Sequence, residues 1–226
     1  MFTTPFRLGI MIAGALLSAT AARAGLTSVN INSTGGGFTS GASETDWTVT
    51  SPASVTTTPF VTEGTPTTLP FNTWGADSLP TYGWISPHQA YSGGQTDAPG
   101  TWDFTTTFSL AGDIPSTADI AFKVAVDNTL PNSVTLNGNV VTIAGLSGAG
   151  FDLSTTIFTL PTADLVAGTN TLTFVVTNGT GNAGNPVGLL VDFTTETVDT
   201  ASPEPSTALL LVGGLVAIIA RARRKR

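Results

Sequence analysis

The sequence predicts an all-β protein, a jelly-roll β-sandwich, from three observations. Apolar and polar residues alternate at a period of two in several short windows. Threonine, which favours strands, is the commonest residue, and glycine and proline recur between the windows. No helical pattern occurs outside the two ends of the chain. Two sheets are expected because the apolar face of one sheet must be covered by another.

The strongest strand predictions are windows in which the apolar residues share one parity, and we expect each to bury one face. These windows are residues 102–110, 120–127, 171–177 and 187–193. Weaker patterns predict further strands at residues 26–32, 45–50 and 151–160. In the window 120–127, the face opposite the apolar one carries Ala121, Lys123, Ala125 and Asp127.

Turn-forming residues predict the connections. Asn137-Gly138 predicts a two-residue hairpin between strands at 133–136 and 139–143, because such a turn needs positive φ at both central positions. Residues 30–41 and 51–70 are polar and rich in Thr, Gly and Pro, so they are expected to be loops.

Residues 1–24 are predicted to be a secretory signal peptide. Arg7 precedes an apolar run at 8–19, and Ala22-Arg23-Ala24 is a small-x-small cleavage site. A membrane-spanning N-terminal helix is the weaker alternative, because the run is short and no stop-transfer pattern follows it. We expect export through the Sec machinery and a mature chain that begins at Gly25.

The C-terminal end, residues 203–226, contains three elements in order. They are the motif Pro203-Glu204-Pro205, an apolar run at 207–220, and a basic cluster of Arg221, Arg223, Arg224, Lys225 and Arg226. As a helix the run would be about 21 Å long, short of the ~30 Å hydrocarbon core, so it would span a membrane only marginally. Its basic end would stay in the cytoplasm. The alternative is a core helix with a solvated basic end.

This arrangement resembles the PEP-CTERM sorting signal of Gram-negative bacteria, which an exosortase-type transpeptidase recognises. The resemblance implies an exosortase as partner and transit through the inner membrane. It also implies a final place at the cell surface or in an exopolysaccharide-rich extracellular matrix. The expected organisation is therefore a signal peptide (1–24), a β-sandwich domain (25–194), a linker (195–202) and a sorting signal (203–226).

The segment between the two signals is strongly acidic. The chain has 8 Lys+Arg and 15 Asp+Glu, but between residues 25 and 202 the only base is Lys123, and the only acid outside is Glu204. The net charge of the segment is therefore 1 − 14 = −13. Nucleic acid is excluded as a partner, because neutralising phosphates requires clustered Lys and Arg. The chain has no cysteine, which excludes disulfides, thiol nucleophiles and Cys-based zinc sites.

A second resemblance covers most of residues 80–193. A Trp84-Ile85 pair precedes an F-x-x-x-F strand (104–108), an A-x-D-N strand end (125–128), a V-x-L-N-G hairpin (134–138) and a G-x-N-x-L-x-F strand (168–174). This order is similar to that of galactose-binding-like jelly rolls. The resemblance implies that fold, which occurs in carbohydrate-binding modules and adhesion domains, often with a structural Ca²⁺.

The candidate ligand residues lie in a stretch predicted to be rich in loops. Tyr82, Trp84, His88 and Tyr91 combine rings that could stack on a sugar with groups that form hydrogen bonds. For Trp84, and to a lesser degree Tyr82, a place in the core is the alternative.

Asp127 and Asn128, at a strand end, are candidate oxygen ligands for Ca²⁺. A turn-forming Asp-Asn pair is the alternative explanation for them.

No catalytic motif stands out, and His88 is the only histidine. We therefore expect a non-enzymatic, exported surface or matrix protein that binds carbohydrate or exopolysaccharide. The alternative is a purely structural, glycosylated surface protein without a small ligand. Ice binding is disfavoured, because the sequence shows no regular Thr-x-Thr repeat of the kind that builds threonine rows on a solenoid.

Overall fold

The computed structural model describes residues 25–62, 74–75, 78–89, 96–130, 134–142, 145, 150–180 and 185–201. All of them belong to one compact unit, Ala24–Ala201. The predicted signal peptide and sorting signal lie outside the described residues. Within these residues the regular structure is β, apart from two short 3-10 helices, η2 (Pro115–Thr117) and η4 (Thr162–Asp164). The all-β prediction is confirmed.

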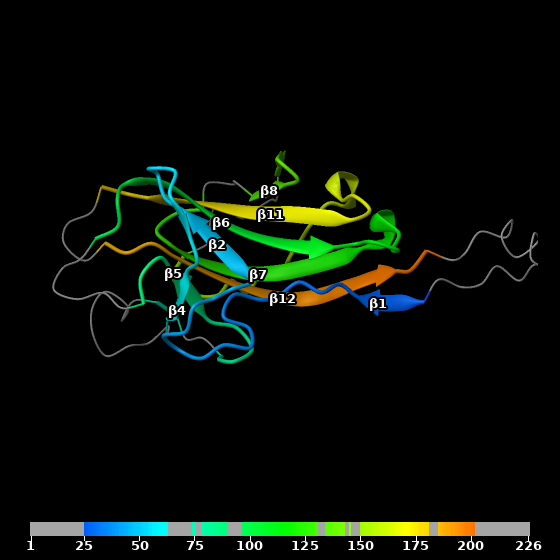
Figure 1. Cartoon of the computed structure of the whole chain (residues 1–226), viewed down its shortest axis with the longest axis horizontal. Helices are drawn as coiled ribbons and strands as arrows, with labels where there is room; N and C mark the ends of the chain where they lie inside the picture. Colours follow the sequence, from blue (N-terminus) through cyan, green and yellow to red (C-terminus); the bar gives the residue numbers. More distant parts are fainter. Residues whose placement is uncertain are drawn as a thin grey trace, which may run out of the picture. The chain divides into compact units, whose positions relative to one another are not determined.

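The described strands form two antiparallel sheets, which lie as two layers of a sandwich (Figure 1). Sheet A has the order β10 (Phe158–Thr159), β7 (Asp119–Asp127), β12 (Gly188–Asp199), β5 (Trp84–Ser86) and β4 (Phe60–Thr62), with β1 (Leu26–Ser28) also paired to β12. Sheet B has the order β3 (Thr56–Thr57), β2 (Trp47–Thr50), β6 (Gly100–Ser109), β11 (Thr169–Asn178), β8 (Val134–Leu136) and β9 (Asn139–Val141).

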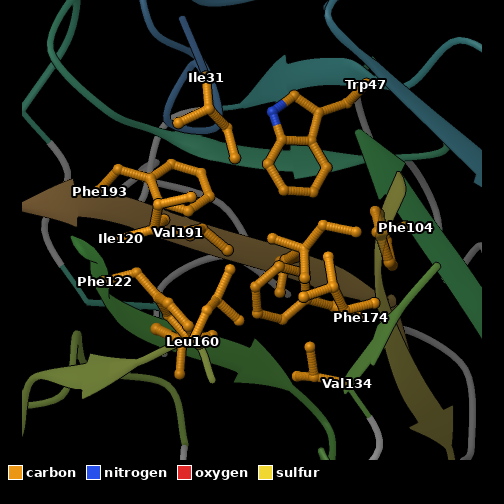
Figure 2. Packing of buried hydrophobic residues seen from close by; sticks show 14 of the residues in the cluster. Ile31, Trp47, Phe104, Ile120, Phe122, Val134, Leu160, Phe174, Val191 and Phe193 are labelled. Atoms are coloured by element: carbon orange, nitrogen blue, oxygen red, sulfur yellow. The ribbon is translucent and has the colours of Figure 1, made fainter. Parts of the chain in front are cut away.

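The core lies between the sheets and is formed by the alternating apolar residues of the longest strands. Figure 2 shows side chains of both sheets pointing toward one another. Phe122 of sheet A meets Phe174 of sheet B edge to face, with ring centroids 5.3 Å apart, and Trp47 is tilted against Phe174 at 6.0 Å. Such aromatic contacts add specific geometry to the area that these residues bury. The faces predicted from the period of two for β6, β11 and β12 up to Phe193 are the buried ones.

The Asn137-Gly138 hairpin is confirmed. β8 and β9 pair antiparallel around it, and Asn137 and Gly138 have φ of 54° and 82°. The Asn137 side chain also fixes the hairpin to β11, because its Oδ1 accepts a hydrogen bond from the Thr171 amide at 2.9 Å and its Nδ2 donates to Asn170 Oδ1 at 2.9 Å.

Several predicted boundaries were wrong. The expected loop at 51–70 contains β3 and β4, and β5 lies in the stretch predicted to be rich in loops. Conversely, only β10 forms within the strand predicted at 151–160, and only β1 within 26–32. These short segments are strands because neighbouring strands pair with them, which local periodicity does not reveal.

The predicted linker was placed too early. β12 continues to Asp199, and β1 pairs with its last residues. Two hydrogen bonds join Thr200 and Gly25. The Thr200 amide donates to the Gly25 carbonyl at 2.9 Å, and the Gly25 amide donates to the Thr200 side-chain Oγ1 at 3.0 Å. The β-domain therefore ends at about residue 201.

β7 is buried on both faces over most of its length, contrary to the expectation of one buried face. On its outer face Ala121, Ala125 and Asp127 are buried. A second small core covers part of the outer side of sheet A, formed by Trp74, Trp84, Ala125 and Leu190 with Tyr82 and Leu153 packed against it.

Candidate functional site

A pocket of about 540 Å³ lies where the segment after β1 runs beside β12. It is lined by Ile31, Asn32, Ser33, Gly36, Gly37, Pro80, Thr81, Asp192, Phe193 and Glu196. Two backbone amides of β12 hold the segment: Val191 N–H donates to Thr34 Oγ1 at 2.8 Å, and Phe193 N–H donates to Ser33 Oγ at 2.9 Å. This volume is within the usual range for small-molecule sites.

The two carboxylates of the pocket stand on either side of an irregularity in β12. The register with β7 shifts between Phe193 and Thr195, as in a β-bulge. Before the shift, Phe193 faces the core and Asp192 lies opposite Lys123 in the ladder; after it, Glu196 lies opposite Ile120. Both side chains line the pocket, one from each side of this shift.

Burial is the largest influence on the pKa values of the two pocket carboxyl groups. Partial burial raises the pKa of Asp192, and Lys123 opposes that rise. Burial, followed by the negative charge of Asp192, raises the pKa of Glu196 to about 7. Lys123 and Asp192 do not form an ion pair within 4.0 Å, and the structure shows no hydrogen bond from any described residue to the Glu196 carboxylate. The pocket therefore has two acids and no base in its lining.

A glycine turn forms another wall. Gly35 has φ of 68°, and a Cβ there would lie 3.0 Å from the Gly83 amide nitrogen, so a side chain would be both strained and obstructed. The fully buried Glu44 holds this turn, because its Oε2 accepts the Gly35 amide at 2.7 Å and its Oε1 accepts the Asp46 amide at 3.0 Å. Burial is the largest influence on Glu44 and raises its pKa to about 7.

The floor and rim of the pocket differ in polarity. Ile31 and Phe193 form the apolar floor of the pocket and are core residues only 3% and 8% exposed. Figure 2 shows both among the packed side chains of the core. Asn32 and Thr81 are exposed at the rim. An apolar surface bordered by hydrogen-bonding groups suits a ligand that has both CH faces and hydroxyls, as sugars do.

The structure removes Trp84 from the predicted ligand site. Trp84 is completely buried, stacks on Trp74 with ring centroids 4.4 Å apart, and donates its indole N–H to the Gly75 carbonyl at 3.0 Å. No face of the ring is open to a sugar, so the core alternative holds for this residue. Tyr82 is half-buried against the same cluster.

His88 is placed apart from the pocket residues. Its Nε2 lies 3.0 Å from Asp97 Oδ1, and its side chain is 39% exposed whereas that of Asp97 is 1% exposed. Asp97 Oδ2 also accepts the Val187 amide at 2.7 Å. Tyr91 lies outside the described residues, so its part in the predicted site is untested.

Asp127 and Asn128, the candidate Ca²⁺ ligands, take part in hydrogen bonds within the domain. The Asp127 carboxylate accepts the Trp74 indole N–H at 2.7 Å through Oδ2 and the Asn128 amide through Oδ1, while Asn128 Oδ1 accepts the Gly179 amide at 3.1 Å. Among the described residues no group of three or more His, Asp or Glu side chains could hold a metal ion. Burial raises the pKa of Asp127, which the two hydrogen bonds oppose. These contacts agree with a structural turn, the alternative explanation from the sequence.

The outer face of sheet B carries an unexpected pattern. Thr48, Thr105, Thr173 and Thr135 are register partners across β2, β6, β11 and β8, and Thr105 Oγ1 lies 2.8 Å from Thr173 Oγ1. Residues that are far apart in the sequence thus form one row, which no local repeat in the sequence predicts.

Sequence reasoning missed Asp192, Glu196 and Glu44 as candidate site residues. Asp192 and Glu196 are separated by a bulge, which has no sequence signal here, and Glu44 precedes β2 as an ordinary turn residue. Lys123, the single base of the acidic segment, was the only usable signal, because its register partner is Asp192.

Comparison with known proteins adds no assignment: no family model, curated protein or solved structure matches this chain. In the part of the chain that the structure describes, no helix has the length and apolarity needed to cross a membrane.

Proposed function

We propose that this chain is a non-enzymatic, exported surface or extracellular-matrix protein of a Gram-negative bacterium that binds carbohydrate through the pocket beside β12. The observation that carries the proposal is the pocket itself, with an apolar floor at Ile31 and Phe193 and hydrogen-bonding groups around it. Its partners would be an exopolysaccharide and, during delivery, the Sec machinery and an exosortase-type enzyme.

Export and sorting rest on the two ends of the sequence, and the fold is compatible with both. Gly25, the predicted first residue of the mature chain, lies directly before β1, so cleavage there would leave every described strand intact. The β-domain ends at about residue 201, immediately before the Pro203-Glu204-Pro205 motif. The two antiparallel sheets also agree with the proposed galactose-binding-like jelly roll.

The test is binding of the mature protein to an array of oligosaccharides and to the exopolysaccharide of its host. We expect Thr81→Trp to abolish binding, because Thr81 is exposed at the pocket and an indole would fill it. The matched control is Thr48→Trp, the same change at an exposed threonine of sheet B, which should bind like the unmodified protein.

Three outcomes would contradict the proposal. If the unmodified protein binds no glycan, the proposed function is wrong. If Thr48→Trp loses binding as fully as Thr81→Trp, the pocket is not the binding site. Release of reducing ends from a bound oligosaccharide would show an enzyme, since paired carboxylates can hydrolyse glycosides. If His88→Ala or Tyr91→Ala loses binding while Thr81→Trp keeps it, the binding site is the one predicted from the sequence and not the pocket.

The threonine row of sheet B favours a second candidate function, a structural surface protein that is glycosylated. Thr48 and Thr107 expose hydroxyls on this face, and Thr105, Thr135, Thr171 and Thr173 are partly exposed there. A mass above that of the polypeptide, measured on intact protein from the native host, would support this candidate.

A further inference from the structure

We infer that the pocket selects a sugar unit with a free, protonated amine, so that its ligand is a polysaccharide containing amino sugars rather than neutral or acidic units. This inference rests on the proposed carbohydrate-binding function and names the ligand class of the same site.

The first argument is the charge of the lining. Two of the ten lining residues, Asp192 and Glu196, are acidic, and none is Lys, Arg or His. Lys123 lies opposite Asp192 in the ladder and supplies a partial counter-charge to it. Glu196 has no such neighbour: the described residues give its carboxylate neither a hydrogen bond nor an ion pair. The site thus holds a partly buried acid that lacks a donor.

The second argument is what a ligand could supply there. A carboxylate that is partly removed from water is costly in its charged form unless a donor or a positive charge compensates it. A sugar ammonium provides both, and hydrogen bonds between charged partners are about twice as strong as neutral ones. An N-acetylated unit offers a single neutral N–H in the same place, and a uronic acid would place its own carboxylate beside Asp192 and Glu196.

The third argument is the field of the whole domain. The segment 25–202 has a net charge of 1 − 14 = −13, with Lys123 as its only base. Such a field attracts polycations and repels polyanions before contact, with a dependence on ionic strength. Selection for an amine is therefore supported by both the pocket and its surroundings.

The remaining walls fit the non-ionic part of such a ligand. Pro80, an exposed lining residue, presents apolar surface to a CH face, and Asn32 and Thr81 can pair with hydroxyls at the rim. A simple divalent cation would use the carboxylates and leave this surface without a partner, which is why we favour a sugar.

The test compares three oligosaccharides of equal length by titration calorimetry on the mature protein. They are an oligomer of glucosamine, its fully N-acetylated counterpart and an oligogalacturonate, at a pH where the amine is protonated. We expect the glucosamine oligomer to bind at least about tenfold more tightly than the acetylated one, the effect of one charge-assisted hydrogen bond. This preference should shrink as NaCl is raised.

Glu196→Gln should reduce the amine preference, measured as the ratio of the two affinities, to within about twofold, because the amide keeps the shape and removes the charge. Asp192→Asn is a second variant that should weaken the same preference. Asp152→Asn removes one charge at an exposed position outside the pocket and should retain the full preference. Circular dichroism checks that each variant is folded.

The outcomes separate the two proposals. If the acetylated oligomer binds as tightly as the amine, the inference is wrong and carbohydrate binding stands. If no oligosaccharide binds, both the amine preference and the proposed carbohydrate binding are wrong. A glucosamine preference that is unchanged in folded Glu196→Gln, or saturable binding of CaCl₂ at the pocket without sugar binding, would also overturn the inference.

Discussion

Burial raises the pKa of five carboxyl groups in the described part of the β-domain, and these groups make its stability depend on pH. They are Glu44, Asp103, Asp127, Asp192 and Glu196. In each case loss of hydration is the largest cause. The chain supplies one lysine to this segment, so most of its acids have no basic partner to lower their pKa values.

We predict that the folded protein loses stability as the pH rises from about 4.5 to about 7. Glu44 and Glu196 have native pKa values of about 7 and ordinary values of 4.5. In this window the native state holds protons that the unfolded state has released, so the free energy of unfolding decreases with pH. Thermal unfolding followed by circular dichroism across this range measures the effect.

Glu196→Gln should make that pH dependence shallower, whereas the exposed Asp152→Asn should leave it unchanged. An unfolding midpoint that increases between pH 5 and 7 would contradict the assignment of raised pKa values to these acids.

At the scale of elements, β12 organises the domain. It pairs with β7, β5 and β1, carries both pocket carboxylates, and receives the segment that forms the opposite pocket wall. Its first residue, Gly188, lies against the Trp74 ring on the outer side of sheet A. This contact couples the start of the strand to the small core around Trp84.

We predict that Gly188→Ala destabilises the protein by about 2 kcal/mol, within the usual range for an over-packed site. A Cβ at this position would lie 2.5 Å from Trp74 Cη2, so the indole must move away from its hydrogen bond to Asp127. Denaturant unfolding gives the loss of stability, and tryptophan fluorescence reports the changed environment of the ring.

Gly150→Ala is the matched control, because a Cβ there would meet no atom within 4 Å and the position has no positive φ. If the two alanine variants were equally stable, the tight packing of Trp74 on β12 would be refuted.

The elements also show which parts of the fold could be predicted. β6, β7 and β11 are long, and the period of two identifies their core faces, because half of each strand's residues must be apolar to fill the sandwich. β3, β4 and β5 have two or three residues each, too few for a period to be recognised. Their strand conformation depends on hydrogen bonds from partners distant in the sequence.

At the scale of the whole molecule, the β-domain is closed by its own two ends. β1 pairs with the last residues of β12, and Gly25 and Thr200 form hydrogen bonds with each other. Removal of a signal peptide before Gly25 and of a tail after residue 202 would therefore leave the described domain complete.

We predict that the mature protein isolated from its native host begins at Gly25 and lacks the peptide that carries Arg221, Arg223, Arg224, Lys225 and Arg226. Mass spectrometry of the intact protein and of its terminal peptides measures both ends. A mature chain that retains residues 1–24, or one that keeps the basic cluster, would refute the corresponding processing step. Replacing Pro203-Glu204-Pro205 by alanines should leave the tail attached.

The sequence by itself determined the all-β class, the buried faces of the long strands and the Asn137-Gly138 hairpin, because alternation and turn chemistry act between neighbouring residues. It also determined the acidity of the domain, and it predicts the export and sorting signals. Only the tertiary structure decided that Trp84 belongs to a second small core, that Asp192 and Glu196 share a pocket with the Gly36–Gly37 turn, and that threonines of four strands form one row. These features depend on strand register, a bulge and the path of a loop, and each of them brings together residues that are distant in the chain.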